Sequence, residues 1–225
     1  MPELQLFIAL QFITFFKGRA FSAGGDLNWL MDRHRDDKEN NERIMFSFYK
    51  KFLDLRSIPV PIIAAINGPA IGAGLAMAMG LCDIRVASKK ATMGLTFTKL
   101  GLHPGMGSLH FAPLLVGSAN AADLLLTGRV IKADEAFDMG LISRVCEGDV
   151  VEEGLALAED ICNAAPMAVE TTVMALRQRQ DATGLGLDES LKLDAKSQAL
   201  TYNTQDFAEG LASLKEKRSP NFIGS

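Results

Sequence analysis

Two glycine-bearing turns hold the groups in this sequence that are best suited to chemistry. The first turn runs from Ser22 to Asp26 and the second from Gly68 to Gly74. Each lies between a predicted strand and a predicted helix, where backbone N–H groups stay unpaired and the positive end of the helix dipole adds to their field. Two such turns placed face to face would bind an oxyanion. From spacing alone, a pair of ordinary strand-to-helix turns is the simpler interpretation.

Standard catalytic signatures are absent from the rest of the chain. The stretch Gly105-x-Gly107-x-x-His110 departs from the dinucleotide-binding pattern, and no predicted strand leads directly into it. The sequence has no phosphate-binding P-loop, no Gly-x-Ser-x-Gly nucleophile turn and no His-Glu-x-x-His zinc motif. Its three cysteines lie far apart in the sequence, so they indicate neither a disulfide framework nor a metal site and favour a reducing compartment.

The elements that must position the two turns alternate between strands and helices. Asp26 is a predicted helix N-cap, and apolar residues three and four apart predict a helix over 40–57. Short apolar stretches predict strands over 62–66 and 82–87. A helix entered through glycines is predicted between these strands, over 72–80.

From Ser108 onward the pattern is mainly helical. Strands that alternate with helices and are followed by a helical tail indicate an α/β core over 1–148 and an α-helical C-terminal region over 149–225. The predicted helices cover 108–116, 118–127, 133–139 and about 150–164, 166–181, 186–203 and 204–215, with a short strand over 142–146.

Composition limits the classes of protein to which the chain can belong. Of its 225 residues, 48% are apolar and 22% are charged, which supports a substantial core and excludes long disorder. The net charge of −4 argues against a broad nucleic-acid-binding surface. The apolar segment Leu6–Phe16 is too short to span a bilayer, which takes about twenty residues. It favours a buried strand, with a targeting sequence or a misassigned start as the alternative.

Four segments, taken in order, resemble successive motifs of the crotonase superfamily, the enoyl-CoA hydratase/isomerase family. They read RAFSAGGDL, AAINGPAIGAGLAMAMGLCDIRVAS, KLGLHPGMGS and LLLTGRVIKADEAFDMGLISRV, and the tail QDFAEGLASLKEKRSPNF resembles the family's last helices. The resemblance runs from about Lys17 to Phe222. It implies a crotonase-like α/β spiral of ββα units with an α-helical C-terminal trimerisation region, and therefore a homotrimer or homohexamer.

The resemblance also implies a substrate and a site. Members of the family bind acyl-CoA thioesters and hold the thioester oxygen between two backbone amides, which by motif position are those of Ala23 and Ala73. Gly105 matches a position whose amide helps to place the water in hydratases. Residues expected to contact substrate are Ser22, Gly24, Asp26, Ala76, Phe97 and Lys217. No cofactor and no metal are expected, since coenzyme A is part of the substrate.

The departures from the family pattern bear directly on the chemistry. The two glutamates that hydratases use as acid and base would fall at Ala76 and Phe97, and no glutamate occurs between Glu42 and Glu135. Alanine and phenylalanine cannot transfer protons, so hydration by two glutamates is not supported, whereas a decarboxylation needs less acid–base help. His103 is the candidate base, because imidazole titrates near neutral pH; alternatively, it ties down a turn.

The sequence therefore predicts an acyl-CoA-binding enzyme, a lyase or isomerase of fatty acid metabolism that stabilises an enolate in a backbone oxyanion hole. The alternative is a non-catalytic acyl-CoA-binding protein or a partner subunit of a crotonase-fold oligomer. The family has one further strand–turn unit before Gly18, so we expect a truncated or misassigned start. The expected location is the cytoplasm, or an organelle matrix in a eukaryote, without secretion and without a nucleic-acid or membrane partner.

Overall fold

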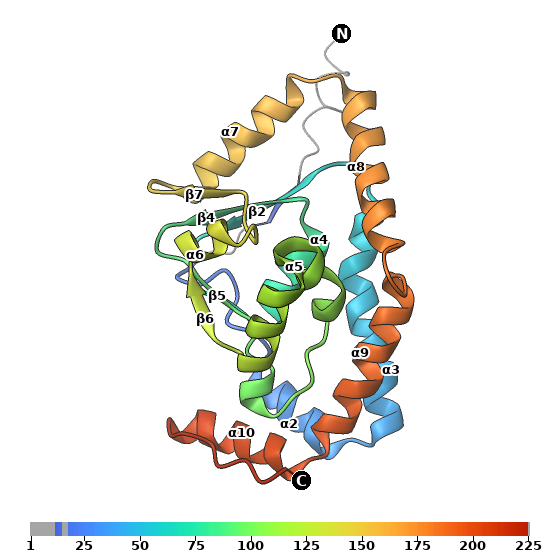
Figure 1. The fold of residues 1–225 in the computed structure, drawn as a ribbon, viewed down its shortest axis with the longest axis vertical. Helices are drawn as coiled ribbons and strands as arrows, with labels where there is room; N and C mark the ends of the chain where they lie inside the picture. Colours follow the sequence, from blue (N-terminus) through green and yellow to red (C-terminus); the bar gives the residue numbers. More distant parts are fainter. Residues whose placement is uncertain (1–11, 15–17, 225) are drawn as a thin grey trace.

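The structure is a computed structural model that describes residues 12–14 and 18–224. Figure 1 shows α7 beside β2, β4 and β7, α9 alongside α3, and α10 across the end of the molecule where α2 lies. In chain order the elements are β1 (Phe12–Thr14), α2 (Leu27–Arg35), α3 (Lys38–Leu53), η1 (Asp54–Ser57), β2 (Ile62–Ile66), β3 (Ala70–Ile71), α4 (Ala73–Leu81), β4 (Ile84–Ser88), β5 (Thr92–Gly94), η2 (Thr98–Leu100), α5 (Ser108–Thr127), β6 (Val130–Lys132), α6 (Ala133–Asp138), β7 (Arg144–Cys146), α7 (Val150–Cys162), α8 (Pro166–Asp181), α9 (Leu187–Tyr202) and α10 (Gln205–Glu216).

The larger sheet is parallel and runs in the order β1, β2, β4, β7. Its strand β2 is buried along its whole length, as expected for a parallel strand covered on both faces. Successive side chains of a strand point to opposite faces. Ile63 and Ala65 accordingly join α7 in a small apolar cluster, whereas Ile62, Ala64 and Ile66 belong to the main core.

The smaller sheet runs in the order β3, β5, β6. β3 and β5 are parallel, with Ala70 opposite Met93 and Ile71 opposite Gly94, and β5 and β6 are antiparallel. An isolated parallel bridge between Ser22 and Ala70 adds the first glycine-bearing turn to the open side of β3. The first turn therefore enters this sheet as a neighbour of β3.

Short polar side chains fix where several helices begin. The side chains of Asp26, Asp37, Asp149 and Thr204 accept hydrogen bonds from backbone N–H groups in the first turns of α2, α3, α7 and α10. Pro166 lies in the first turn of α8, where its missing N–H is not needed. Each cap of this kind is worth about 1 kcal/mol. Of these residues, Asp26 was predicted as a cap from the sequence, and α3 begins two residues before its predicted start at residue 40.

The long apolar helix α5 is a core helix. By length and composition it would be able to cross a membrane. Its side chains Phe111, Val116 and Leu124 are buried within the molecule, and the helix packs against α4, α9 and η2. Gly117 has a non-helical backbone (φ 75°, ψ 162°) in the middle of α5. This break lies between the helices predicted over 108–116 and 118–127.

A buried arginine joins α8 to the larger sheet. The side chain of Arg177 is 2% exposed and donates through Nε and Nη2 to the two carboxylate oxygens of Asp83, at 2.8 and 2.5 Å. Asp83 also accepts from the N–H of Ile62, where β2 begins. The remaining guanidinium hydrogens go to the carbonyl oxygens of Arg56, Ile58 and Val60. All five N–H donors of Arg177 are therefore used within the protein.

Most of the predicted elements lie at or near their predicted positions. β2 has the predicted bounds, and the four helices of the C-terminal region are α7 to α10. The helix predicted over 40–57 consists of α3 followed by η1. β1 lies inside the apolar segment Leu6–Phe16, and the rest of that segment falls outside the described residues.

The helices that follow Asp149 are not separated from the rest of the chain. α7 packs on β2 and β4, α9 lies along α3, and α10 packs on η2 and α2. The division into an α/β core over 1–148 and a helical region over 149–225 stays a prediction. The homotrimer or homohexamer stays a prediction as well.

Candidate active site

The smaller sheet holds the two glycine-bearing turns side by side. The N–H of Ser22 donates to the carbonyl of Pro69 at 3.0 Å, and the carbonyl of Ser22 accepts from the N–H of Ile71 at 2.9 Å. These two bonds form the parallel bridge between Ser22 and Ala70. Because β5 is parallel to β3 on the other side, the chain runs in one direction through all three segments. Residues that follow parallel segments emerge at the same edge of a sheet.

Three segments therefore leave the sheet at a common edge. The N–H of Gly72 donates to the carbonyl of Gly94 at 2.8 Å, which holds the segment after β3 against the end of β5. A Cβ atom on Gly72 would lie 3.9 Å from the hydroxyl oxygen of Thr96. The predicted site residues carried by these three segments are Ala23, Ala73 and Phe97.

Two glycines allow the turns to lie in direct contact. A Cβ atom on Gly74 would come within 3.0 Å of Cβ and Oγ of Ser22, closer than real Cβ atoms come. A Cβ atom on Gly68 would collide in the same way with the carbonyl oxygen of Arg19. The missing side chain at Gly74 therefore lets the two turns touch, and the missing side chain at Gly68 lets the second turn approach the residues just before the first turn.

The N–H groups of Ala23 and Ala73 remain available as donors. Neither donates to any acceptor within 12–14 and 18–224. Ala73 is the first residue of α4, where a helix offers its N–H no internal acceptor, and no side chain caps this end. The helix dipole adds a positive potential there. The structure thus brings both predicted oxyanion donors to one edge without using either of them.

The first turn is shaped by its own side chains. The hydroxyl of Ser22 accepts from the N–H of Gly24 at 3.4 Å, and the carboxylate of Asp26 accepts from the N–H of Trp29 at 3.0 Å. Asp26 therefore caps α2, which is the role that the sequence also suggested. The substrate contacts expected of Ser22, Gly24 and Asp26 stay predictions.

The positions expected to hold glutamates are apolar and buried. Ala76 lies one turn after Ala73 on α4 and has no exposed surface, and Phe97 is 8% exposed. Neither side chain can donate or accept a proton. Within the described ranges, no group of three or more His, Cys, Asp or Glu side chains is arranged to hold a metal ion. Proton transfer at this edge therefore needs another group.

His103 lies in the loop that follows η2. It comes directly after Leu102, whose N–H donates to the carbonyl of Phe97 at 3.0 Å. The backbone of His103 binds α9, because its N–H donates to Thr201 Oγ1 at 3.1 Å and its carbonyl accepts from Gln198 Nε2 at 2.8 Å. The main chain, and not the ring, therefore anchors this turn.

The imidazole of His103 is half-buried. Its Nδ1 has no hydrogen-bond partner in the part of the chain that the structure describes. Burial lowers the pKa of His103 below its ordinary value of 6.5, and the nearby carbonyl of Pro104 opposes this shift. The ring is therefore neutral at pH 7, which is the form that accepts a proton.

The loop residues 103–107 are held by side chains that the sequence analysis did not single out. Gly105 is buried, and a Cβ atom on it would collide with the hydroxyl of Tyr49. Tyr49 donates to Gln198 Oε1 at 2.5 Å, and Asp194 Oδ2 accepts from the N–H at position 107 at 2.9 Å. The signal in the sequence was a row of polar residues at 194, 198 and 201, spaced to share one face of a helix.

Lys217 lies at the C-terminal end of α10, with a left-handed backbone (φ 55°). Its ammonium group forms no ion pair with the described residues. The neighbouring Arg218 is paired with Glu209 and Glu216. A contact between Lys217 and a CoA phosphate stays a prediction.

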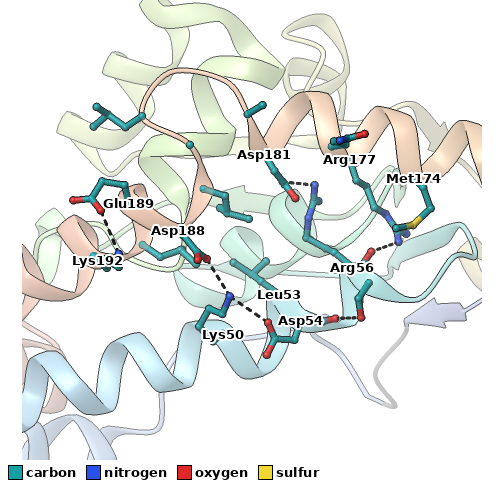
Figure 2. A pocket seen from close by; sticks show the side chains of 17 residues that line it. Lys50, Leu53, Asp54, Arg56, Met174, Arg177, Asp181, Asp188, Glu189 and Lys192 are labelled. Carbon is teal, nitrogen blue, oxygen red and sulfur yellow. Dashed lines mark hydrogen bonds and ion pairs between the residues drawn. The ribbon is translucent and has the colours of Figure 1, made fainter.

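A groove with a volume of about 1070 Å³ lies elsewhere in the protein. Figure 2 shows this groove, which lies between α3, η1, α8 and the start of α9. None of the predicted site residues lines it. Its charged side chains are paired with one another or with neighbours, as Lys50 is with Asp188, Arg56 with Asp181 and Lys192 with Glu189. The groove therefore offers no unpaired charge to a ligand, and we keep the edge of the smaller sheet as the candidate site.

Comparisons with known proteins point to one family. A family model described as Enoyl-CoA hydratase/isomerase matches residues 12–225. The chain is similar to the mouse protein named enoyl-CoA hydratase domain-containing protein 2, mitochondrial, with 34% identity over all of this chain and 75% of the relative. It is 40% identical to rat mitochondrial methylglutaconyl-CoA hydratase over 76% of this chain, but spans only 55% of that relative's length.

Solved structures show the same architecture. A crystal structure of an enoyl-CoA hydratase/isomerase from Mycobacterium paratuberculosis has a TM-score of 0.80 at 28% identity, covering 90% of this chain and 79% of that one. An enoyl-CoA hydratase/isomerase from Pseudoalteromonas atlantica T6c has a TM-score of 0.76 at 30% identity, covering 99% of this chain and 86% of that one. The likeness thus extends over nearly all of the described residues.

Proposed function

The chain belongs to the enoyl-CoA hydratase/isomerase family of the crotonase superfamily, and from that premise we propose that it binds an acyl-CoA thioester and stabilises the enolate formed from it. Its α/β crotonase fold, predicted from the sequence, is confirmed by the likeness to solved structures. In the proposed reaction, the thioester oxygen accepts hydrogen bonds from the N–H groups of Ala23 and Ala73.

One observation carries the proposal. The bridge between Ser22 and Ala70 holds the two turns side by side. The N–H groups of Ala23 and Ala73, which follow the bridged segments, donate to no described residue. Ala23 is exposed and Ala73 is half-buried, so both N–H groups are open to water or to a ligand. A pair of them at one sheet edge supports an oxyanion-binding role.

The chemistry follows from where charge develops. Removing a proton from Cα of a thioester moves negative charge onto the carbonyl oxygen. Donors already fixed in place stabilise this charge more than they stabilise the neutral substrate, and so they lower the barrier. In a site shielded from water, one such donor contributes roughly 3 kcal/mol, which is on the order of a hundredfold in rate.

Proton handling distinguishes this protein from a two-glutamate hydratase. Ala76 and Phe97 supply no acid or base, so the concerted addition of water across a double bond lacks its usual partners. Abstraction of a single proton needs one base, and loss of CO2 from a 2-carboxyacyl thioester needs less acid–base help still. We therefore propose an enolate-forming reaction in which His103 is the candidate base.

The test is to follow both reactions by proton NMR in heavy water. Butyryl-CoA reports exchange at Cα, and crotonyl-CoA reports hydration at Cβ. We expect the enzyme to exchange the Cα protons of butyryl-CoA and to leave crotonyl-CoA unhydrated. Hydration of crotonyl-CoA at a rate comparable to exchange would contradict the proposed division of roles. Binding of both thioesters with neither reaction would favour the non-catalytic acyl-CoA-binding alternative.

Replacing His103 with alanine is expected to slow Cα exchange about 100-fold, since a positioned general base contributes roughly 10²–10⁴ in rate. The loop should keep its path, because its anchors to α9 are main-chain bonds of residue 103. The matched control is His34→Ala, which removes an imidazole from α2. Exchange in the His103 variant at the wild-type rate would exclude this ring as the base.

The pH dependence of this step has a definite sign. The ring of His103 accepts a proton only when it is neutral, and burial lowers its pKa below 6.5. The contribution of His103 to the rate of Cα exchange should therefore persist below pH 6.5 and fall once the pH drops through the lowered pKa of this ring. Protonation of the folded state is also disfavoured, so any stability that depends on His103 is present above pH 6.5 and lost as the pH falls through the lowered pKa.

A further inference from the structure

A row of polar side chains on α9 holds the loop 103–107. Asp194, Gln198 and Thr201 follow one another at spacings of four and three, which places them on one face of the helix. Gln198 and Thr201 bind the main chain of the loop's first residue, and Asp194 binds that of its last. The path of the loop is therefore set by α9 at both ends.

Asp194 is the charged member of this row. Its side chain is 2% exposed, and its Oδ2 accepts from the N–H of Gly107 at 2.9 Å. Gly107 directly precedes the first turn of α5, so the carboxylate faces a helix N-terminus, where negative charge is stabilised. Asp194 has no ion pair within the described residues. A buried carboxylate held only by a backbone N–H is unusual, because carboxylates are almost never fully buried unless paired.

We propose that Asp194 is a positioning residue, whose ionised carboxylate holds the loop 103–107 and thereby fixes the amide of Gly105 toward the substrate. The inference rests on the proposed function, because Gly105 is linked to the substrate through the family resemblance. A carboxylate accepts a shorter and stronger hydrogen bond from an N–H than a neutral carboxyl group does. Protonation of Asp194 therefore loosens the end of the loop that joins α5.

Asp194 changes charge in a pH range where its neighbours do not. Burial raises its pKa to about 7. The tyrosine and histidine side chains on the elements around it are Tyr49 on α3, His103 in the loop, His110 on α5 and Tyr202 on α9. Burial raises the pKa of both tyrosines and lowers the pKa of both histidines. Between pH 7 and 8 these four groups stay neutral, while Asp194 loses its proton.

The charged groups near the start of α9 are already paired. Lys50 on α3 donates to Asp188, and Asp181 at the end of α8 accepts from Arg56. Each of these charges lies beside a partner of the opposite sign, and neither ion pair includes Asp194.

The ionised carboxylate has opposite effects on the loop and on the whole fold. The folded pKa lies above the ordinary value of 3.8, so folded protein holds a proton on Asp194 that the unfolded chain has released. Global stability from this residue is present below about pH 4 and decreases as the pH rises toward 7. The hydrogen bond to Gly107 strengthens over the upper part of that range. A tighter loop in a less stable protein is a combination that general unfolding does not produce.

Amide hydrogen exchange tests this without reference to activity. Exchange into the full chain is measured at pH 6, 7 and 8 by mass spectrometry, and each rate is corrected for the intrinsic pH dependence of exchange. In the wild type, protection of the peptide that covers 101–109 against amide exchange should rise roughly tenfold from pH 6 to pH 8. This factor corresponds to a difference of about 1.4 kcal/mol between the hydrogen bonds to a charged and to a neutral acceptor. Asp194→Asn keeps an acceptor oxygen of the same shape but cannot ionise. Its protection should be independent of pH.

The control is Asp188→Asn on the same helix, where the side chain is 68% exposed. This variant should keep the wild-type pH response. Protection of 101–109 that does not change with pH in the wild type, or that changes equally in Asp194→Asn, would overturn the proposal. Thermal unfolding at pH 8 shows that the variant folds, because removing a buried charge should raise its melting temperature relative to the wild type.

Activity separates the two proposals from each other. If the wild type exchanges the Cα protons of butyryl-CoA, its rate constant for this exchange at saturating substrate should fall roughly tenfold from pH 8 to pH 6. The Asp194→Asn variant should not show this decrease and should keep the wild-type KM. If the wild type exchanges no protons at any pH, the proposed function fails. The hydrogen-exchange result then still decides whether Asp194 controls the loop.

Discussion

Replacing Ala73 with proline is expected to slow Cα-proton exchange of an acyl-CoA roughly 100- to 1000-fold, the loss typical for one oxyanion donor. Proline removes the N–H that is proposed to bind the thioester oxygen and removes nothing else from the main chain. Because the proposed role belongs to the backbone, ordinary side-chain substitutions at this position do not test it.

The local geometry is compatible with this substitution. Ala73 is the first residue of α4, a position where proline is favoured because its fixed φ suits the helix and its N–H has no internal acceptor. The preceding residue, Gly72, has φ 55° and ψ −121°. This is the mirror image of the extended conformation that residues before proline favour, and glycine adopts either hand. The helix should therefore form as before.

The measurement is the rate of Cα exchange by NMR, alongside thioester binding and thermal unfolding. Ala73→Val is the matched control, since it adds comparable bulk and keeps the N–H. We expect the valine variant to retain most of the activity and the proline variant to lose it without a large change in melting temperature. A proline variant that exchanges within tenfold of the valine variant would remove Ala73 from the oxyanion hole.

Replacing Arg177 with alanine is expected to destabilise the fold by about 3–5 kcal/mol, the range for breaking a buried ion pair. The change leaves the carboxylate of Asp83 without its guanidinium and leaves three carbonyl groups short of a donor. Lysine should restore only part of the loss, because one ammonium cannot reproduce the planar set of five donors.

Thermal and urea unfolding measure this effect. A loss of this size corresponds to a drop in melting temperature of roughly 10 °C for a domain of this length. Arg179→Ala is the control, because Arg179 is exposed on the same helix and has no ion pair among the described residues. An Arg177→Ala protein that unfolds within 1 kcal/mol of the Arg179 variant would show that the network is not stabilising.

The elements that carry their own local signals were predictable from the sequence. β2 is a continuous apolar run bounded by prolines and by Asn67-Gly68, so its bounds were set by its neighbours. The helices α2, α7 and α10 begin directly after Asp26, Asp149 and Thr204, whose side chains cap them. In each case, the residues that define the element lie within a few positions of its ends.

The smaller sheet was not predictable in the same way. β3 has two residues, and β5 and β6 have three each, which is too short for an alternating pattern to appear. These strands exist because Ala70 and Ile71 lie between Ser22 and β5, partners that are distant in the sequence. The sheet that positions the candidate site is therefore a product of long-range packing.

The sequence indicated the two turns of the candidate site but not the side chains that hold the neighbouring loop. Ala23 and Ala73 were assigned from the family resemblance of the two glycine-bearing turns, and their role stays a prediction. The anchoring of the loop after η2 was not predicted, because Tyr49 and Asp194 lie far from that loop in the sequence and resemble ordinary helix residues. A buried polar row on a helix points to a partner, but it does not identify which loop it holds.

The contact between Ser22 and Gly74 has a consequence for how such a protein diverges. The two turns are joined by main-chain hydrogen bonds and by the lack of a side chain at position 74, so no reactive side chain takes part in the joint. A lineage is therefore free to lose its acid and base groups, or to recruit new ones, without disturbing the two turns that are proposed to bind the carbonyl. Residue 74 is the exception, because any larger amino acid there would force the two turns apart.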